Sequence, residues 1–279
     1  MGSQMFAVKR KFIPKRVRVV LKGFTFMTVT LLNLSAHATT IVAVFTNNEF
    51  VIGADGRMID ASIHDETCKI AALNNKVAFA NYGATFVTPK DGAPRIDMYQ
   101  VAKQIAVSGQ DISELAARFG PNAAAKFNTL PASGRRPPGA IDPMTVGIFG
   151  GFNADESPQL SFIPISYSET ANNFIIGALT THTTVGKFNL FPPFNFSSEI
   201  VNGTEFNAIK AIRYISDAER LAREIESYIL QTIARRPTEM INGSQIEQIG
   251  GTPTVLIIEK GQRPRWYRRA KECPDLSEA

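Results

Sequence analysis

The residues with the clearest chemical potential begin at Thr39, which directly follows the small-residue pattern Ala36-His37-Ala38. An A-x-A pattern is typical of the cleavage site that ends a secretory signal peptide. Cleavage there would make Thr39 the first residue of the mature protein. A threonine with a free α-amino group carries its own general base, which is one way to activate a weak hydroxyl nucleophile. The sequence therefore predicts that export itself creates a catalytic Thr39.

The segment before Thr39 has the composition of an export signal. Residues 1–38 contain seven of the chain's 30 Lys and Arg residues, no Asp or Glu, and a final apolar run from Phe24 to Leu34. That run is short for a membrane span. We therefore expect 1–38 to be a signal peptide and 39–279 to be one exported domain, periplasmic or extracellular and free of the membrane after cleavage. The alternative is an uncleaved leader that stays as a membrane anchor.

The positive charge of the chain belongs to this leader. Without it, 23 Lys and Arg residues face 25 Asp and Glu residues, a net charge of −2, so nothing indicates nucleic-acid binding. The mature domain has two histidines, His64 and His182, which disfavours a His-rich zinc site. We expect no metal and no other cofactor. Cys68 and Cys273 are its two cysteines, and the sequence leaves open whether they pair.

A catalytic Thr39 needs a cation, a carboxylate and an oxyanion donor around it. Asp55 and Arg57 follow the second apolar run, Lys69 opens the third, and Gly83 closes the fourth. A Lys69 ammonium would lower the pKa of the Thr39 amine by like-charge repulsion, which makes that amine a base at neutral pH. We expect Asp55 to orient Lys69 and Arg57 to brace Asp55. The Gly83 N–H is the expected oxyanion donor.

Each of these residues also has a purely structural interpretation. Asp55 and Arg57 could form an ion pair at a strand end, Lys69 could be a solvated strand end, and Gly83 could serve a turn. Two charged groups elsewhere are interpreted as a solvated loop and as an amphipathic edge strand, rather than as a metal site and an anion-binding surface. The first consists of Asp60, His64, Asp65 and Glu66, and the second of Arg263, Arg265, Arg268, Arg269 and Lys271 around Trp266 and Tyr267.

Hydrophobic periodicity indicates the elements that position these residues. Four runs open the mature domain and are apolar nearly throughout, so both faces of their sheet should be covered. The runs are Thr39–Thr46, Phe50–Asp55, Cys68–Leu73 and Lys76–Tyr82. Helices are expected after Asp97 and after Asp111, where Asp111 is a predicted N-cap with Glu114 as its partner.

The later part of the chain repeats this alternation. Strands are predicted at Met144–Phe149, Gln159–Ser166, Asn173–Leu179 and Thr254–Glu259, with an edge strand within Arg263–Lys271. Helices are predicted at Glu205–Tyr214 and Asp217–Arg235, the second with a Ser216–Glu219 capping box, and loops at 131–143 and 180–204. This order favours an α+β fold of two antiparallel sheets stacked between helical layers.

The segment from Thr39 to Gly83 resembles the proteasome β-subunit family of N-terminal-nucleophile (Ntn) hydrolases, including the bacterial proteasome-type peptidases. The resemblance rests on the Thr-Thr start, the Gly-Ala-Asp-x-Arg end of the second strand, and the later Lys69 and Gly83. Asp55 and Arg57 lie sixteen and eighteen residues after Thr39, and Gly83 lies fourteen after Lys69, as in that family.

The resemblance implies a four-layer αββα sandwich and a threonine peptidase that acts through an acyl-Thr39 intermediate without a cofactor. It also implies a peptide or small amide as substrate and a closed homo-oligomer, such as a ring. Related folds cleave non-peptide amides, so a small-molecule amidase or acylase is the alternative enzyme. A catalytically silent, proteasome-like assembly subunit is the alternative outside enzymes.

The chain departs from the family at two places. The Met58–Thr67 loop is shorter than usual. The family's Asp-x-x-Ser before the last strand is replaced by Ile246 and Ile249, a change that favours the silent subunit. Glu247 or Ser244 is the available substitute for the missing hydrogen bonds to the nucleophile's amine.

Overall fold

The computed structural model describes ten stretches of the chain: 39–59, 63–87, 95–106, 111–130, 144–186, 188–191, 217–234, 238–241, 244–247 and 249–276. These stretches belong to one compact unit. The expected signal peptide 1–38, the loop 131–143 and the helix Glu205–Tyr214 lie outside them.

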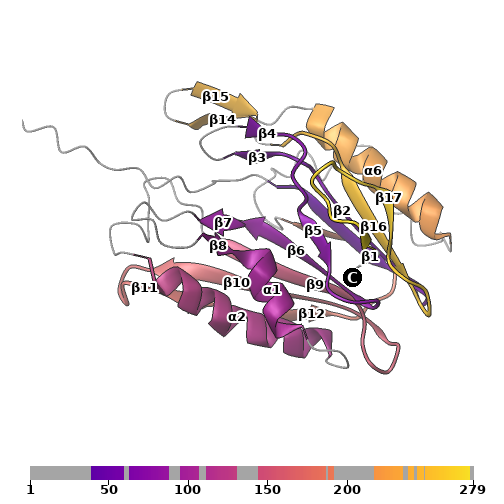
Figure 1. The fold of residues 1–279 in the computed structure, drawn as a ribbon, viewed down its shortest axis with the longest axis horizontal. Helices are drawn as coiled ribbons and strands as arrows, with labels where there is room; N and C mark the ends of the chain where they lie inside the picture. The colour runs from indigo at the N-terminus through magenta and orange to yellow at the C-terminus, as the bar shows by residue number, and fades with distance from the viewer. Residues whose placement is uncertain are drawn as a thin grey trace, which may run out of the picture. The chain divides into compact units, whose positions relative to one another are not determined.

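One antiparallel sheet has five strands in the order β13, β1, β2, β16, β17 (Figure 1). The strands are β1 Ile41–Phe45, β2 Glu49–Ala54, β13 Phe188–Phe191, β16 Thr254–Glu259 and β17 Arg265–Arg268. Ile41 lies opposite Ala54, so the residues before β1 run beside those after β2. This register brings the predicted nucleophile next to the predicted carboxylate.

The second antiparallel sheet has the order β11, β10, β9, β6, β5, and β12 also pairs with β10. Its strands are β5 Ile70–Ala72, β6 Val77–Gly83, β9 Thr145–Phe152, β10 Pro158–Ser168, β11 Asn173–Ile176 and β12 Thr180–His182. Three short hairpins complete the described strands: β3 Met58–Ile59 with β4 Ile63–His64, β7 Phe86–Val87 with β8 Ile96–Asp97, and β14 Thr238–Ile241 with β15 Ser244–Glu247.

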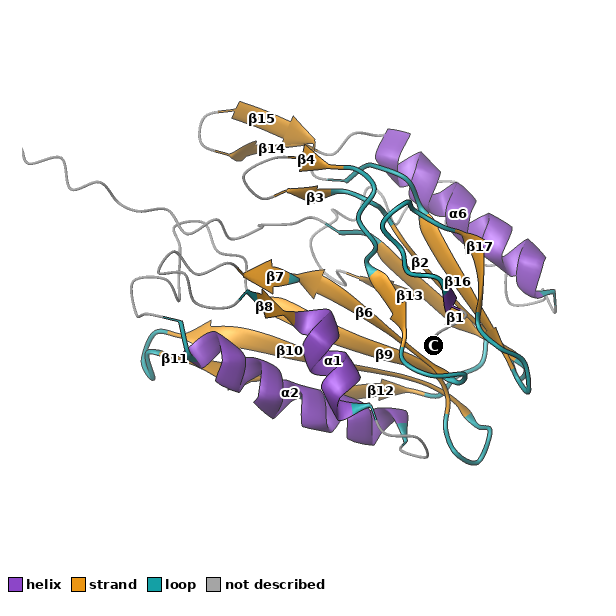
Figure 2. Cartoon of the chain, viewed as in Figure 1, coloured by secondary structure: helices purple, strands orange, loops and turns teal. Residues whose placement is uncertain are grey.

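Apolar side chains cover both faces of the central strands, as the uninterrupted apolar runs predict. Along β1, Ile41, Ala43 and Phe45 join a cluster shared with β5, β6, β9 and β10 of the other sheet. Val42 and Val44 instead pack with α6, Ala218–Ala234. The six-stranded sheet packs its other face against α1, Met98–Ile105, and α2, Ile112–Asn128 (Figure 2). The mixed α+β class with antiparallel sheets is therefore confirmed.

Helix capping shows where local sequence signals hold and where they fail. Asp97 caps α1 by accepting hydrogen bonds from two backbone N–H groups, and Asp217 does the same for α6. Asp111 occupies the N-cap position of α2, but its side chain makes no capping hydrogen bond. The amide oxygen of Asn153 accepts from Ile112 N at 2.9 Å instead, so the predicted N-cap position is correct but a distant residue supplies the capping bond. Ser216 of the predicted capping box lies outside the described residues.

The stretch 180–204 was predicted to be a loop, and in its described part only residues 183–186 are one. It contains β12 and β13, and β13 adds a strand beside β1. Both strands are short and gain their stability from pairing with distant segments, which periodicity does not reveal.

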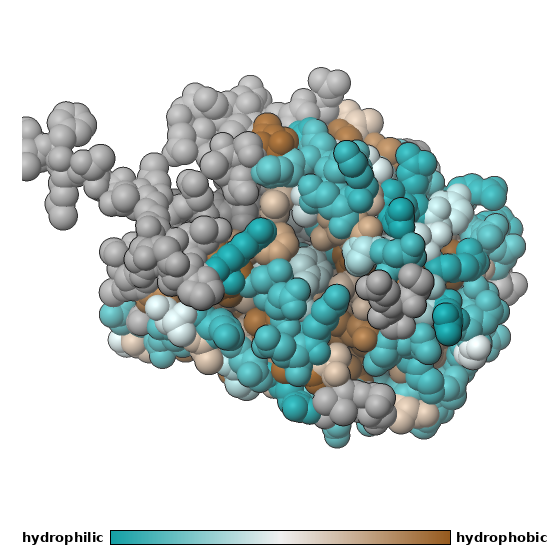
Figure 3. Space-filling view, viewed as in Figure 1, coloured by the Kyte–Doolittle hydropathy of each residue, from teal (hydrophilic) through white to brown (hydrophobic). Residues whose placement is uncertain are grey.

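The basic segment near the C-terminus forms strand β17, as predicted. Arg265 pairs with Glu219 and Glu259, and Arg268 pairs with Glu226. These contacts agree with an amphipathic edge strand rather than an anion-binding surface. Figure 3 shows hydrophilic residues over most of the described surface on one face, with apolar patches between them. Among the described helices, none has the length and apolar character needed to cross a membrane.

Candidate active site

Three buried polar side chains meet beside the start of β1 and the end of β2. Lys69 Nζ lies 3.0 Å from Thr39 Oγ1 and 3.1 Å from each carboxylate oxygen of Asp55. The exposed fractions of Thr39, Asp55 and Lys69 are 2%, 0% and 3%. Thr39 leads into β1, Asp55 follows β2, and Lys69 precedes β5 of the other sheet. The two sheets together therefore assemble three of the five residues predicted from sequence.

The Asp55 carboxylate also accepts hydrogen bonds from three backbone N–H groups. Their nitrogens belong to Thr40 at 2.8 Å, Arg57 at 3.3 Å and Gly250 at 3.3 Å. Sequence reasoning missed the donors at Thr40 and Gly250. The first follows from the antiparallel register of β1 and β2, and the second comes from the segment that leads into β16. Asp55 is thus held in place from three separate segments of the chain.

Burial dominates the electrostatics of this group. It raises the pKa of the Asp55 carboxyl, against the opposing effects of the Lys69 charge and the Thr40 N–H. Burial likewise lowers the pKa of the Lys69 ammonium, against the attraction of Asp55. A buried ion pair often costs more in lost hydration than its attraction returns, so it is weak evidence for a stabilising role. The contact of Lys69 with the Thr39 hydroxyl distinguishes this pair from an isolated buried ion pair.

Arg57 contacts Asp55 through its backbone rather than through the predicted brace of its side chain. Its guanidinium pairs with Asp65, with Nε–Oδ1 at 2.6 Å and Nη2–Oδ2 at 3.1 Å. Gly250 packs directly on this guanidinium, since a Cβ at Gly250 would lie 2.5 Å from Arg57 Cζ. Asp65 lies on an exposed segment, as the solvated-loop interpretation predicts, but its carboxylate and that of Glu66 both make contacts within the chain. Glu66 accepts hydrogen bonds from the Thr252 hydroxyl and from Lys271 N.

Gly83 ends β6 with a φ of +85°, a conformation that strongly favours glycine. A Cβ there would lie 2.5 Å from the carbonyl oxygen of Met144. β5 and β6 are antiparallel, and Ile70 pairs with Ala80. The C-terminal end of β6 at Gly83 and the start of β5 after Lys69 therefore lie at the same end of the two strands. Gly83 can therefore be the glycine that the chain needs to turn at the end of β6 and also be the oxyanion donor through its N–H, so the two interpretations are compatible.

A buried polar network lies directly before Gly83 and was missed at the sequence level. The Thr145 hydroxyl donates to Asn81 Oδ1 at 2.9 Å, and Asn81 Nδ2 donates to Thr85 Oγ1 at 3.2 Å. The signal that could have revealed it is Asn81 itself, a polar residue within the apolar β6. This network fixes the backbone on either side of Gly83.

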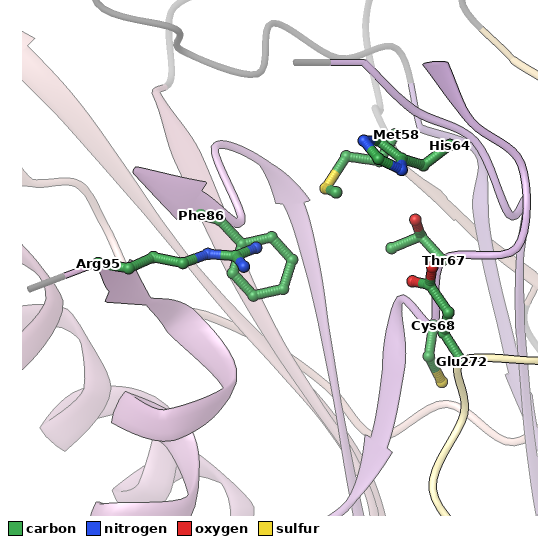
Figure 4. Close-up of a pocket in the computed structure, with 7 residues that line it drawn as sticks. All are labelled: Met58, His64, Thr67, Cys68, Phe86, Arg95 and Glu272. Atoms are coloured by element: carbon green, nitrogen blue, oxygen red, sulfur yellow. The ribbon is translucent and has the colours of Figure 1, made fainter. Parts of the chain in front are cut away.

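A cavity of about 310 Å³ opens beside Thr67 and Cys68, the two residues that precede Lys69 in sequence (Figure 4). Its lining residues are Met58, His64, Thr67, Cys68, Phe86, Arg95 and Glu272. Thr67, two residues before Lys69, is 3% exposed, and its hydroxyl has no hydrogen-bond partner within the described chain. On the opposite side, the Arg95 guanidinium lies 3.7 Å from the centre of the Phe86 ring. Most of the lining side chains are polar or charged, and Met58 and Phe86 are its large apolar members.

The remaining predictions for this region have mixed outcomes. Cys68 and Cys273 form a disulfide, which settles the question that the sequence left open. Ile249 is buried and apolar, so it offers no side-chain hydrogen bond to the site. The backbone of Ser244–Glu247 forms β15, whereas its side chains lie outside the description. In the described stretches, no group of three or more His, Cys, Asp or Glu side chains is arranged to hold a metal ion.

Comparisons with known proteins add no family assignment. No protein-family model matches the chain, and no curated protein matches it significantly.

Proposed function

We propose that the mature protein is an exported N-terminal threonine hydrolase that cleaves peptide or amide bonds through an acyl-Thr39 intermediate. The observation that carries the proposal is the placement of Lys69 Nζ between Thr39 Oγ1 and the Asp55 carboxylate. A buried ammonium next to a hydroxyl is a costly arrangement for structure alone. Here the hydroxyl belongs to the residue that a signal-peptidase cut would expose.

The proposed chemistry uses only groups of this chain and water. In the precursor, the Thr39 nitrogen is part of a peptide bond and is not basic. After cleavage, the free amine takes the hydroxyl proton as Oγ1 attacks the substrate carbonyl carbon. The protonated amine then passes that proton to the leaving amine as the amide bond breaks. Water hydrolyses the acyl-Thr39 ester, again with the amine as general base.

The neighbouring residues adjust this chemistry. The Lys69 charge opposes protonation of the Thr39 amine and stabilises negative charge on Oγ1 during attack. Asp55, fixed by its backbone donors, keeps Lys69 in position. We assign the oxyanion to the Gly83 N–H, with Asn81 and Thr145 holding that backbone. The cavity beside Thr67 offers space for one side of a substrate.

We also infer the four-layer αββα arrangement of Ntn hydrolases. The supporting observation is that three apolar clusters separate four layers of structure. One cluster packs α1 and α2 on the six-stranded sheet, the second lies between the two sheets, and the third packs α6 on the five-stranded sheet. Together with the local resemblance to proteasome β-subunits, this arrangement supports a homo-oligomer as the assembled form.

A catalytically silent assembly subunit is the second candidate. The buried Ile249 favours it, because the family's polar residues at this place support the nucleophile's amine. The Lys69 contact to Thr39 Oγ1 favours the enzyme, since a silent subunit has no need of a buried ammonium there.

The test begins with mass spectrometry of the exported protein, for which we expect Thr39 as the first residue. Turnover is then measured on a panel of peptide amides and acyl amino acids, which separates a peptidase from a small-molecule amidase. Thr39→Ala should abolish turnover and Thr39→Ser should restore part of it. Thr40→Ala is the matched control, because it keeps the backbone N–H that contacts Asp55. A mature protein that starts elsewhere, or an active Thr39→Ala variant, contradicts the proposal.

A further inference from the structure

The backbone at Lys69 has little support from its own sheet. The strand that follows it, β5, has three residues, lies at the edge of the six-stranded sheet and pairs there with β6. Lys69 itself precedes the strand and lies outside this ladder. Short edge segments with few backbone hydrogen bonds are the parts of a fold that open most readily. A residue that must hold a hydroxyl oxygen at 3.0 Å therefore needs support from elsewhere.

The C-terminal tail supplies that support. Glu272 N donates to the carbonyl oxygen of Glu66 at 3.2 Å, and Lys271 N donates to the Glu66 carboxylate at 3.0 Å. Cys273 is disulfide-bonded to Cys68, the residue directly before Lys69 and 205 positions away from Cys273 in sequence. The three tail residues Lys271–Cys273 are thus fastened to the segment that carries Lys69.

The tail is itself anchored to the body of the domain on both sides of the disulfide. Trp266, on β17, and Leu276, beyond the disulfide, both pack against the apolar cluster between the sheets. Trp266 Nε1 also donates to the carbonyl oxygen of Pro274 at 3.1 Å. Because β17 is the edge of one sheet and β5 the edge of the other, the tail joins the two sheets beside Lys69.

We propose that the tail Lys271–Cys273 is a positioning element for Lys69, and that the Cys68–Cys273 disulfide makes hydrolysis depend on an oxidising compartment. This inference rests on the proposed function of the site. A dithiol reductant that donates two electrons and two protons would convert the disulfide into two thiols and would itself become a disulfide. The segment before β5 would then lose its covalent attachment, and Lys69 would gain conformational freedom and contact with water.

The test compares four forms of the mature protein: oxidised, reduced with a dithiol and alkylated, Cys68→Ala/Cys273→Ala, and Glu66→Ala with its disulfide intact. Circular dichroism establishes that each form is folded. Two readouts follow: the pH profile of kcat/KM on the best amide substrate, and the pKa of Lys69 from its ¹³Cε resonance in lysine-labelled protein. The second readout needs no turnover. Tyr167→Phe is the control, because it loses a hydrogen bond to Asn172 in the β10–β11 hairpin, at the edge of the six-stranded sheet opposite β5, and keeps its aromatic ring.

We expect kcat/KM to fall by about 10- to 100-fold in the reduced and double-cysteine forms, the scale that misplacement by about 1 Å produces. The pKa of Lys69 should rise toward its ordinary value in the same forms, because water reaches the ammonium. If both forms unfold, Glu66→Ala decides, with smaller changes in the same directions. Tyr167→Phe should behave like the oxidised wild type.

Folded reduced protein with an unchanged rate profile and an unchanged Lys69 pKa overturns the positioning role, as does an unchanged Glu66→Ala variant where that variant decides. If the oxidised wild type turns over no substrate while reduction still shifts the Lys69 pKa, the proposed hydrolase function fails and the tether remains. The two failures are therefore distinguishable.

Discussion

Replacing Lys69 by Met removes the ammonium and keeps most of the side-chain volume. Removing one partner of a buried ion pair typically destabilises a protein by about 3–5 kcal/mol, because the other charge is left uncompensated. Here Asp55 keeps its three backbone N–H donors, from Thr40, Arg57 and Gly250. We therefore expect a loss near the lower end, about 3 kcal/mol at neutral pH, in urea or guanidinium unfolding.

The pH dependence of this loss identifies its cause. Without Lys69, the strongest influence that lowers the pKa of Asp55 is gone, so the folded-state pKa rises further above its unfolded value. A carboxyl with a raised folded pKa contributes stability that is fully present below its unfolded pKa and is lost as the pH rises through the folded pKa. The deficit of Lys69→Met relative to wild type should therefore be small near about pH 4 and largest at neutral pH.

Turnover of Lys69→Met should fall by about 10²- to 10⁴-fold, because the Thr39 amine loses the neighbouring charge that keeps it a general base at neutral pH. Lys76→Met is the matched control, since Lys76 forms a half-exposed pair with Glu156 at the far end of β6. Such pairs contribute about 1 kcal/mol or less, and we expect normal turnover for the control. A folded Lys69→Met protein with wild-type turnover, or with a stability deficit that does not vary with pH, refutes the reasoning.

Three further predictions test the surroundings of the site. Gly83→Ala should lower stability by more than Gly261→Ala. Both glycines have a positive φ, which costs an alanine about 1–3 kcal/mol of strain, but only at Gly83 would the new Cβ also clash with the Met144 carbonyl oxygen. Equal losses of stability in the two variants would contradict this. Asp65→Asn should lower stability by at most about 1 kcal/mol and change turnover by less than about threefold, because the Arg57–Asp65 pair is partly exposed. A large loss of turnover would instead indicate a catalytic role for the Arg57 guanidinium. Native mass spectrometry of the purified mature protein should show a closed homo-oligomer, and an active strict monomer would favour a stand-alone amidase.

Much of the layered core was predictable from local pattern. The apolar runs that became β1, β2 and β6 lack polar alternation, and their burial on both faces follows from that composition alone. The same holds for α6, whose apolar stripe faces the sheet. The strand β13 and the Asn153 cap of α2 were not predictable, because each depends on a partner far away in the sequence.

For the candidate site, the sequence alone determined which residues were available and in what spacing. Thr39, Asp55 and Lys69 stand at the ends of apolar runs, where a chain that leaves a sheet can present polar groups. Their spacing along the chain could not say which atoms would meet. The β1–β2 register and the stacking of two sheets placed Lys69 Nζ between a hydroxyl and a carboxylate.

Only the tertiary structure decided how this group is held. The Gly250 N–H reaches Asp55 across 195 positions of sequence, and Cys273 reaches Cys68 across 205. Periodicity specifies which face of an element is buried, because burial depends on the side chain itself. The choice of a distant partner depends instead on the order in which strands pair and sheets stack, and that order is a property of the whole fold.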